Sequence, residues 1–145
     1  MSEKLIEEIR QIESVEAVAI ISFKGNVWQQ TKTGIPRETI HHIASYLLKM
    51  AAANEKKQQK LILAELLWLN RSLLARFSNG FFILVIFRNH EVVSLLRITL
   101  NVTVAGLLEE KAFLKWLKKE KSALDIHLKK GQFDEKEVRL ISKLV

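Results

Sequence analysis

The chain has 145 residues, of which 48% are hydrophobic and 27% are charged, and it contains no cysteine. These values indicate one globular domain with a buried core, and they exclude a disordered chain, a disulfide scaffold and a thiolate metal site. The formal net charge of +7 favours an anionic partner, but the basic residues are spread along the chain. We therefore interpret them as a solvated lysine surface.

We expect no targeting signal from the distribution of apolar residues along the sequence. The apolar run Phe81–Phe87 has seven residues, far fewer than the roughly 20 that a membrane-spanning helix needs. Residues 1–14 are amphipathic and acidic and lack the apolar centre of a signal peptide. We expect a cytoplasmic protein with at most peripheral membrane contact.

The first half of the chain predicts a helix, a hairpin and a second helix. Apolar residues at helical spacing indicate a helix over 3–13, and the β-branched run 15–23 indicates a buried strand. The turn 24–26 contains glycine and returns the chain as a second strand over 27–32. After a loop with proline, an apolar stripe of period 3.6 predicts a helix over 37–54.

Three consecutive strands are predicted next, over 60–70, 71–78 and 81–88. Asn79 and Gly80 separate the last two, and Asn-Gly between apolar runs is the strongest short signal for a hairpin. Together with the first hairpin, this meander predicts a five-stranded antiparallel sheet.

The segment that follows carries two conflicting periodicities. Residues 98–104 alternate like a strand, but no glycine or proline interrupts 91–105 and the apolar residues also recur at helical spacing. We predict a helix, which residues 113–117 either continue or replace with another helix. Residues 122–130 are compatible with a short helix, and Asp134 with the cap of a last one. The fold class is therefore α/β in the α+β sense, in the order α-β-β-α-β-β-β-α with a helical C-terminal tail.

Residues with catalytic or ligand-binding chemistry do not converge. His41 and His42 are adjacent, so a helix points them about 100° apart, which suits a solvated flank better than a shared metal. The five glycines form no phosphate-binding loop, and no nucleophile motif occurs. Three tryptophans lie in different elements, which disfavours nucleic-acid binding. We expect no enzyme, no catalytic residue, no metal and no cofactor.

The strand 60–70 is the positive finding, because this order of elements allows it to lie at an edge of the sheet. With the helix 37–54 it offers more apolar surface than one small sheet needs, and pairing with a second copy would cover such an edge. Glu65 interrupts the apolar run and lies either on the solvent side of the sheet or at a partner interface. The predicted interface of a homodimer comprises Ile43, Tyr46, Leu47, Met50, Leu61, Leu63, Glu65, Leu66 and Trp68.

The order and local patterns of these elements resemble the roadblock (dynein light-chain) family, over about residues 3–118. The resemblance rests on the opening LIEEIRQIESVEAVAIIS, the turn FKGN, the helix 37–54, the meander around SNGFFILVIF, and the segment EVVSLLRITLNVTVAGLLEE, which is similar to the closing helix of longer prokaryotic members. It implies a roadblock-like domain over 1–118, of the longin and profilin type, with a helical extension over 119–145.

The resemblance also implies a function. Roadblock proteins have no cofactor and form homo- or heterodimers by joining their third strands, with the central helices packed together. Prokaryotic members often work with Ras-like small GTPases, some as GTPase-activating partners that reposition the GTPase's own groups. We therefore expect a dimeric, non-catalytic scaffold or regulator of a Ras-like small GTPase. The alternatives are a sensory or ligand-binding module of the PAS/GAF type, and a basic adapter on membrane or nucleic acid.

Overall fold

The computed structural model describes residues 2–68, 70–121 and 124–127. The helices of this part are α1 (Ser2–Arg10), α2 (Arg37–Lys56), η1 (His90–Val92), α3 (Val93–Leu107), α4 (Lys111–Lys119) and η2 (Leu124–His127), of which η1 and η2 are short 3-10 helices. Its strands are β1 (Val15–Ser22), β2 (Val27–Gln30), β3 (Leu63–Trp68), β4 (Arg71–Phe77) and β5 (Phe81–Phe87). They form one antiparallel sheet in the order β2-β1-β5-β4-β3, which confirms the predicted five-stranded sheet.

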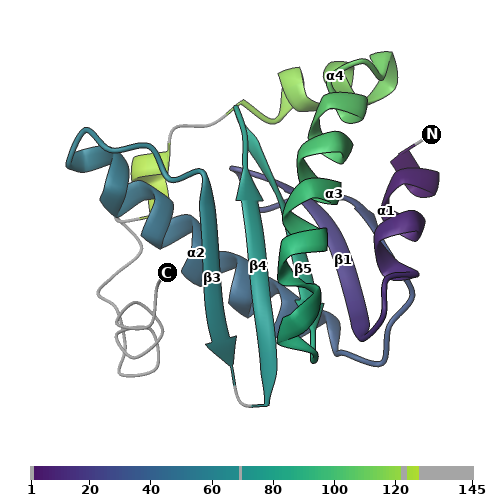
Figure 1. The fold of residues 1–145 in the computed structure, drawn as a ribbon. Coiled ribbons are helices and arrows are strands. Elements are labelled where there is room, and N and C mark those ends of the chain that lie inside the picture. Colours follow the sequence, from purple (N-terminus) through teal and green to yellow (C-terminus); the bar gives the residue numbers. More distant parts are fainter. Residues whose placement is uncertain (1, 69, 122–123, 128–145) are drawn as a thin grey trace.

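Helices cover both faces of this sheet. α2 lies on one face, and α1 and α3 lie on the other (Figure 1). Each helix layer buries its own apolar cluster against the sheet, and alternate residues of each strand point to the two clusters. Every residue of β5 is buried, because this central strand has a helix layer on both sides. A strand in that position reads as a continuous apolar run, as FFILVIF does.

Two glycines make the predicted hairpin turns. Gly25 has φ of +100° and Gly80 has φ of +87°, in the left-handed region that side chains with a Cβ rarely adopt. Gly25 turns β1 into β2, and Gly80 turns β4 into β5. Both hairpins that the sequence predicted are therefore confirmed.

The segment with two periodicities is helical. α3 directs Leu96, Leu100 and Leu107 into the core, so the spacing of these residues outweighs the alternation of the β-branched ones. The axis then bends by 86° between His90–Leu107 and Lys111–Lys119, so residues 113–117 belong to another helix. Among the described residues no single helix is long and apolar enough to cross a membrane, although this bent pair together has the length and composition of one.

Residues after the predicted domain boundary at 118 contact the sheet and α2. The Glu120 carboxylate accepts hydrogen bonds from Ser22 Oγ at 3.0 Å and Asn26 Nδ2 at 2.7 Å. Leu124 joins the cluster under α2, and His127 Nε2 lies 2.5 Å from the Phe23 carbonyl oxygen. The division at 118 stays a prediction, and the last predicted helix after Asp134 lies outside the described residues.

Glu16 joins three strands at one end of the sheet. Its carboxylate on β1 accepts a hydrogen bond of 2.5 Å from Arg71 Nε on β4, and another from Arg88 Nε just beyond β5. Burial by itself raises the pKa of Glu16, but the hydrogen bonds and charges of the two arginines outweigh it and hold the pKa below the ordinary value of 4.5. Ionised Glu16 therefore stabilises the fold.

Replacing Glu16 with glutamine should reduce the amount of stability that the chain loses when the pH falls into the acidic range. Because the pKa of Glu16 is lowered by folding, its contribution is complete above pH 4.5 and is lost as the pH falls through the folded pKa. We expect about 1 kcal/mol or less, since the Arg88 side chain is 63% exposed and water screens the pair. The measurement is the free energy of unfolding in urea at a series of pH values.

Glu13→Gln is the matched control, because it removes the same charge from an exposed side chain three residues away. Acid should destabilise this control as steeply as the parent chain. If Glu16→Gln also lost stability as steeply, the two arginines would not be the cause of the pH dependence.

Candidate functional site

β3 is an outer strand of the sheet, and among residues 2–68, 70–121 and 124–127 it pairs with β4 alone. Trp68 pairs with Arg71 across the tight turn, and the Phe77 amide donates to the Ile62 carbonyl. Because hydrogen-bonded pairs alternate in an antiparallel ladder, the backbone groups of Leu63, Glu65 and Leu67 point away from β4. We call this outward row of backbone donors and acceptors, with which no other strand of the described part pairs, the free edge of β3.

The side chains along this free edge are partly apolar and exposed. Leu67 is 55% exposed, and Ile62, just before β3, is 54% exposed. Ala64 and Leu66 are buried on the α2 face of the sheet, whereas Leu63 packs against the opposite cluster. An edge strand with exposed apolar side chains is a template for pairing with another chain.

Glu65 lies on the α3 face of β3 and is only 8% exposed. Its carboxylate accepts a hydrogen bond of 3.0 Å from Arg97 on α3 and lies 3.3 Å from His90 Nδ1. The alternative of a solvent-facing Glu65 is therefore wrong, because Arg97 on α3 and His90 on η1 cover the carboxylate. Its place in a partner interface stays a prediction.

The other residues of the predicted interface are mostly core residues of the single chain. Five of them are no more than 2% exposed: Ile43, Tyr46, Leu47, Met50 and Leu66. Leu61 and Leu63 are half-buried, and the side chain of Trp68 lies outside the described part. The expected apolar surplus on α2 is thus wrong, because the helix buries its stripe against its own sheet. Participation of this set in a dimer stays a prediction.

The exposed flank of α2 is polar. His41 and His42 face solvent, as predicted. The ring of His42 lies against that of Tyr46 one turn away, with 2.5 Å between His42 Nε2 and Tyr46 Oη. Across residues 2–68, 70–121 and 124–127, no three His, Asp or Glu side chains are grouped as a metal site would need.

Sequence reasoning missed the two exposed residues of the edge, Ile62 and Leu67. The run LILAELLWL is apolar on both faces of β3, so its alternation does not reveal which residues remain uncovered. The missing information is which residues of β3 the helix layers reach, because Arg97 on α3 covers Glu65 whereas Leu67 stays exposed.

No family model matches the sequence, and no curated protein matches it. Solved structures do match. The Roadblock/LC7 domain from Streptomyces avermitilis is similar with a TM-score of 0.59 and 12% identity, over 74% of this chain and 93% of that one. An MglB structure with a tetrameric arrangement has the same TM-score and identity, over 83% and 90%. Myxococcus xanthus MglB has a TM-score of 0.55 and 13% identity, over 69% and 82%.

These structures are only 12–13% identical to this chain, but their TM-scores of 0.55–0.59 are evidence for a common fold. The five-stranded antiparallel sheet, with α2 on one face and α1 and α3 on the other, agrees with them. The chain has the roadblock fold.

Proposed function

We propose that this chain is a non-catalytic scaffold that dimerises through the free edge of β3 and binds a Ras-like small GTPase. The observation that carries the proposal is the free edge itself, with outward backbone groups at Leu63, Glu65 and Leu67. Two copies related by a two-fold axis would pair these groups and form one continuous sheet. The tetrameric arrangement of an MglB structure with the same fold supports self-association.

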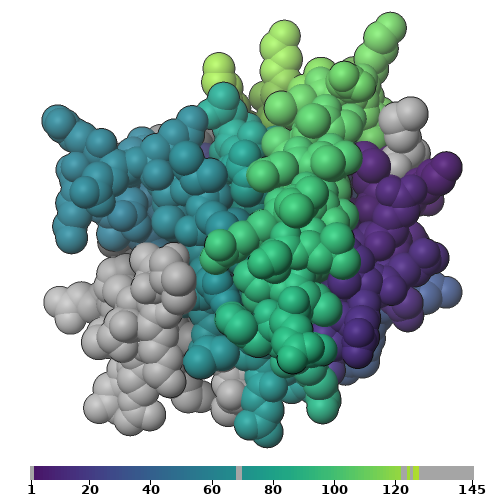
Figure 2. Space-filling model, viewed as in Figure 1, coloured from purple at the N-terminus to yellow at the C-terminus, as the bar shows by residue number. Residues whose placement is uncertain are grey.

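A scaffold needs a second surface that stays open when β3 is paired. α3 carries three exposed apolar residues one turn apart, Leu95, Ile98 and Val102. They lie on the side of α3 opposite the residues that it buries, and Figure 2 shows α3 running across this face of the molecule. Exposed apolar stripes of this kind mark protein interaction sites in many monomers, which supports a partner beside the second copy.

The resemblance to roadblock proteins supports a Ras-like small GTPase as that partner. A scaffold that repositions the GTPase's own groups needs no catalytic residue of its own, and the sequence offers no catalytic motif. The proposal is thus consistent with the chemistry of this chain.

Two measurements test the proposal. Light scattering at micromolar concentration should give twice the chain mass of 16.7 kDa, and a monomeric mass would contradict dimerisation. Pull-down with the purified chain should retain a Ras-like GTPase from the native organism, or mixing the two should accelerate GTP hydrolysis. Neither effect with any of the organism's small GTPases would defeat the proposed partner.

A further inference from the structure

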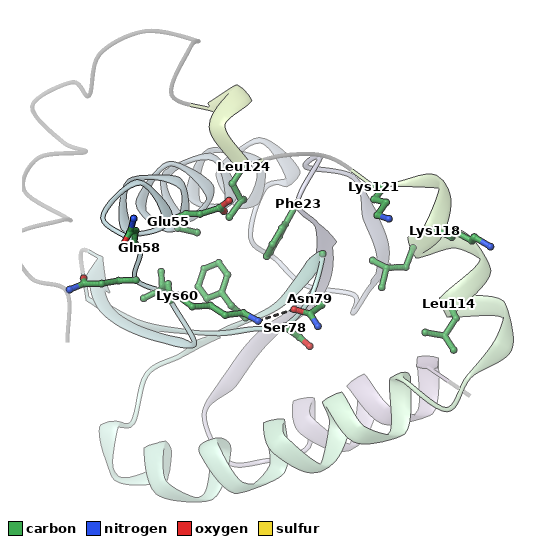
Figure 3. A pocket seen from close by; sticks show the side chains of 16 residues that line it. Phe23, Glu55, Gln58, Lys60, Ser78, Asn79, Leu114, Lys118, Lys121 and Leu124 are labelled. Carbon is green, nitrogen blue, oxygen red and sulfur yellow. Dashed lines mark hydrogen bonds between the residues drawn. The ribbon is translucent and has the colours of Figure 1, made fainter.

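A cavity of about 820 Å³ opens at one end of the sheet, away from the turn between β3 and β4. Its walls come from the end of α2, the segment before β3, the β4–β5 turn, α4, Lys121 and the start of η2 (Figure 3). The volume lies within the range of roughly 300–1,000 Å³ that small-molecule sites occupy. Nothing in the proposed scaffold role requires such a cavity.

The floor of the cavity is aromatic. The Phe77 ring stacks on Phe82 at 5.1 Å and lies 6.5 Å from the Phe23 ring, so its position is held from two sides. Leucines from separate segments, Leu117 and Leu124 among them, complete the apolar wall. An extended apolar chain would therefore find a preformed surface here.

Small residues keep the space open. Ala51 on α2 and Gly80 in the β4–β5 turn both line the cavity. Gly80 has φ of +87°, which the turn requires, and a Cβ at this position would touch Leu117 at 3.5 Å. The hairpin geometry thus excludes a larger side chain at one wall of the cavity.

The polar part of the lining is mainly basic. Lys60, Lys118 and Lys121 line the cavity, against the single carboxylate of Glu55. Lys60 Nζ donates to Asn79 Oδ1 at 2.9 Å, and Figure 3 shows this pair on one side of the cavity and Lys121 on the other, with the Lys118 ammonium pointing outward. None of the ion pairs between described residues includes these lysines. The cavity therefore combines an apolar wall with ammonium groups that form no ion pair within the described part of the chain.

We propose that this cavity binds a single-chain amphiphile with an anionic head, of which a long-chain fatty acid is the simplest example. The alkyl chain lies against Phe77, Leu117 and Leu124, and the carboxylate lies between Lys60 and Lys121. A charge-assisted hydrogen bond to each ammonium fixes the head, and burial of the chain supplies most of the affinity. The site is independent of the proposed dimer and GTPase, so either proposal can fail without the other.

Calorimetric titration of the full chain with hexadecanoate, kept below its micelle concentration, tests the ligand class. We expect saturable binding of one molecule per chain. Octanoate should bind much more weakly, because each methylene removed from an apolar site weakens binding about fourfold. Hexadecanol, which has the same chain and no charge, should also bind more weakly. Absent binding of hexadecanoate, or equal binding of hexadecanol or octanoate, would overturn the proposal.

Charge-reversal variants test the position of the head. Lys60→Glu and Lys121→Glu should each weaken hexadecanoate binding by about tenfold or more, as expected when a hydrogen bond to a charged group is lost. Lys57→Glu and Lys119→Glu are the matched controls, since they make the same change at exposed lysines of the same segments that do not line the cavity. All four side chains are exposed, so the melting temperatures should agree with that of the parent chain.

The controls also separate a pocket from a charged surface. If all four variants lost affinity equally, general attraction by the basic surface would explain the binding and the proposed site would be wrong. Sedimentation with vesicles of anionic phospholipid distinguishes a membrane mode. Binding to vesicles without binding of dissolved hexadecanoate would likewise overturn the proposal.

Discussion

The Leu67→Pro variant should be monomeric at concentrations at which the parent chain is a dimer. Proline has no backbone N–H, and at position 67 this donor points away from β4, toward the proposed second copy. Each two-fold interface would lose a pair of hydrogen bonds, each contributing about 0.5–1.5 kcal/mol. The dissociation constant of the dimer should therefore rise about tenfold to a hundredfold.

The fold of one chain should tolerate this proline. The lost donor makes no bond within the sheet, Leu67 is exposed, and edge strands are where proline is found in sheets. Leu67→Thr is the control, because it also shortens the leucine side chain but keeps the backbone N–H, and its β-branched side chain suits a strand. Sedimentation velocity over a concentration series measures both variants. A Leu67→Pro dimer as stable as that of Leu67→Thr would mean that β3 backbone pairing does not hold the two copies together.

Truncation of Phe113 should cause the largest loss of stability in the α4 region. The side chain is fully buried, and its ring contacts those of Phe81 at 4.9 Å, Trp116 at 5.9 Å and Trp28 at 6.0 Å. Phe113→Ala removes these contacts and leaves a cavity between α4 and the sheet. We expect the free energy of unfolding to fall by about 3–5 kcal/mol.

Leu108→Ala is the comparison for this prediction. Leu108 lies between α3 and α4 and is 43% exposed, so its truncation should cost about 1 kcal/mol or less. Unfolding in urea, monitored by tryptophan fluorescence, measures the stability of both variants, since Trp28 and Trp116 lie beside Phe113. Equal losses for the two variants would show that Phe113 does not anchor α4.

Much of the fold could be predicted because its signals are local. Gly25 and Gly80 identify their turns by the φ angles that the hairpins need. The spacing of Leu96, Leu100 and Leu107 identifies α3 despite the strand-like alternation around it. In each case the deciding interaction lies within a few residues along the chain.

The surface of the proposed site depends on contacts that sequence spacing does not encode. The helical stripe of α2 was correctly recognised as apolar, but Tyr46 and Met50 lie in the core of the chain rather than on its surface. The sequence allows Glu65 to be a solvent-facing charge. In the structure Arg97, which is far along the chain, lies over it and donates a hydrogen bond to its carboxylate. Which residues of β3 stay exposed depends on the packing of α2 and α3, not on the strand itself.

The sequence by itself determined the order of elements, the turns and the absence of known catalytic motifs, because these follow from local conformational preference and the period of apolar residues. Only the tertiary structure decided that Leu67 is open while Leu66 is buried, and that Phe23, Lys60 and Leu117 line one cavity. The physical reason is that burial and cavity walls are properties of surfaces in contact. Those surfaces come from segments distant in sequence, and their contact is established only when the helices pack on the sheet.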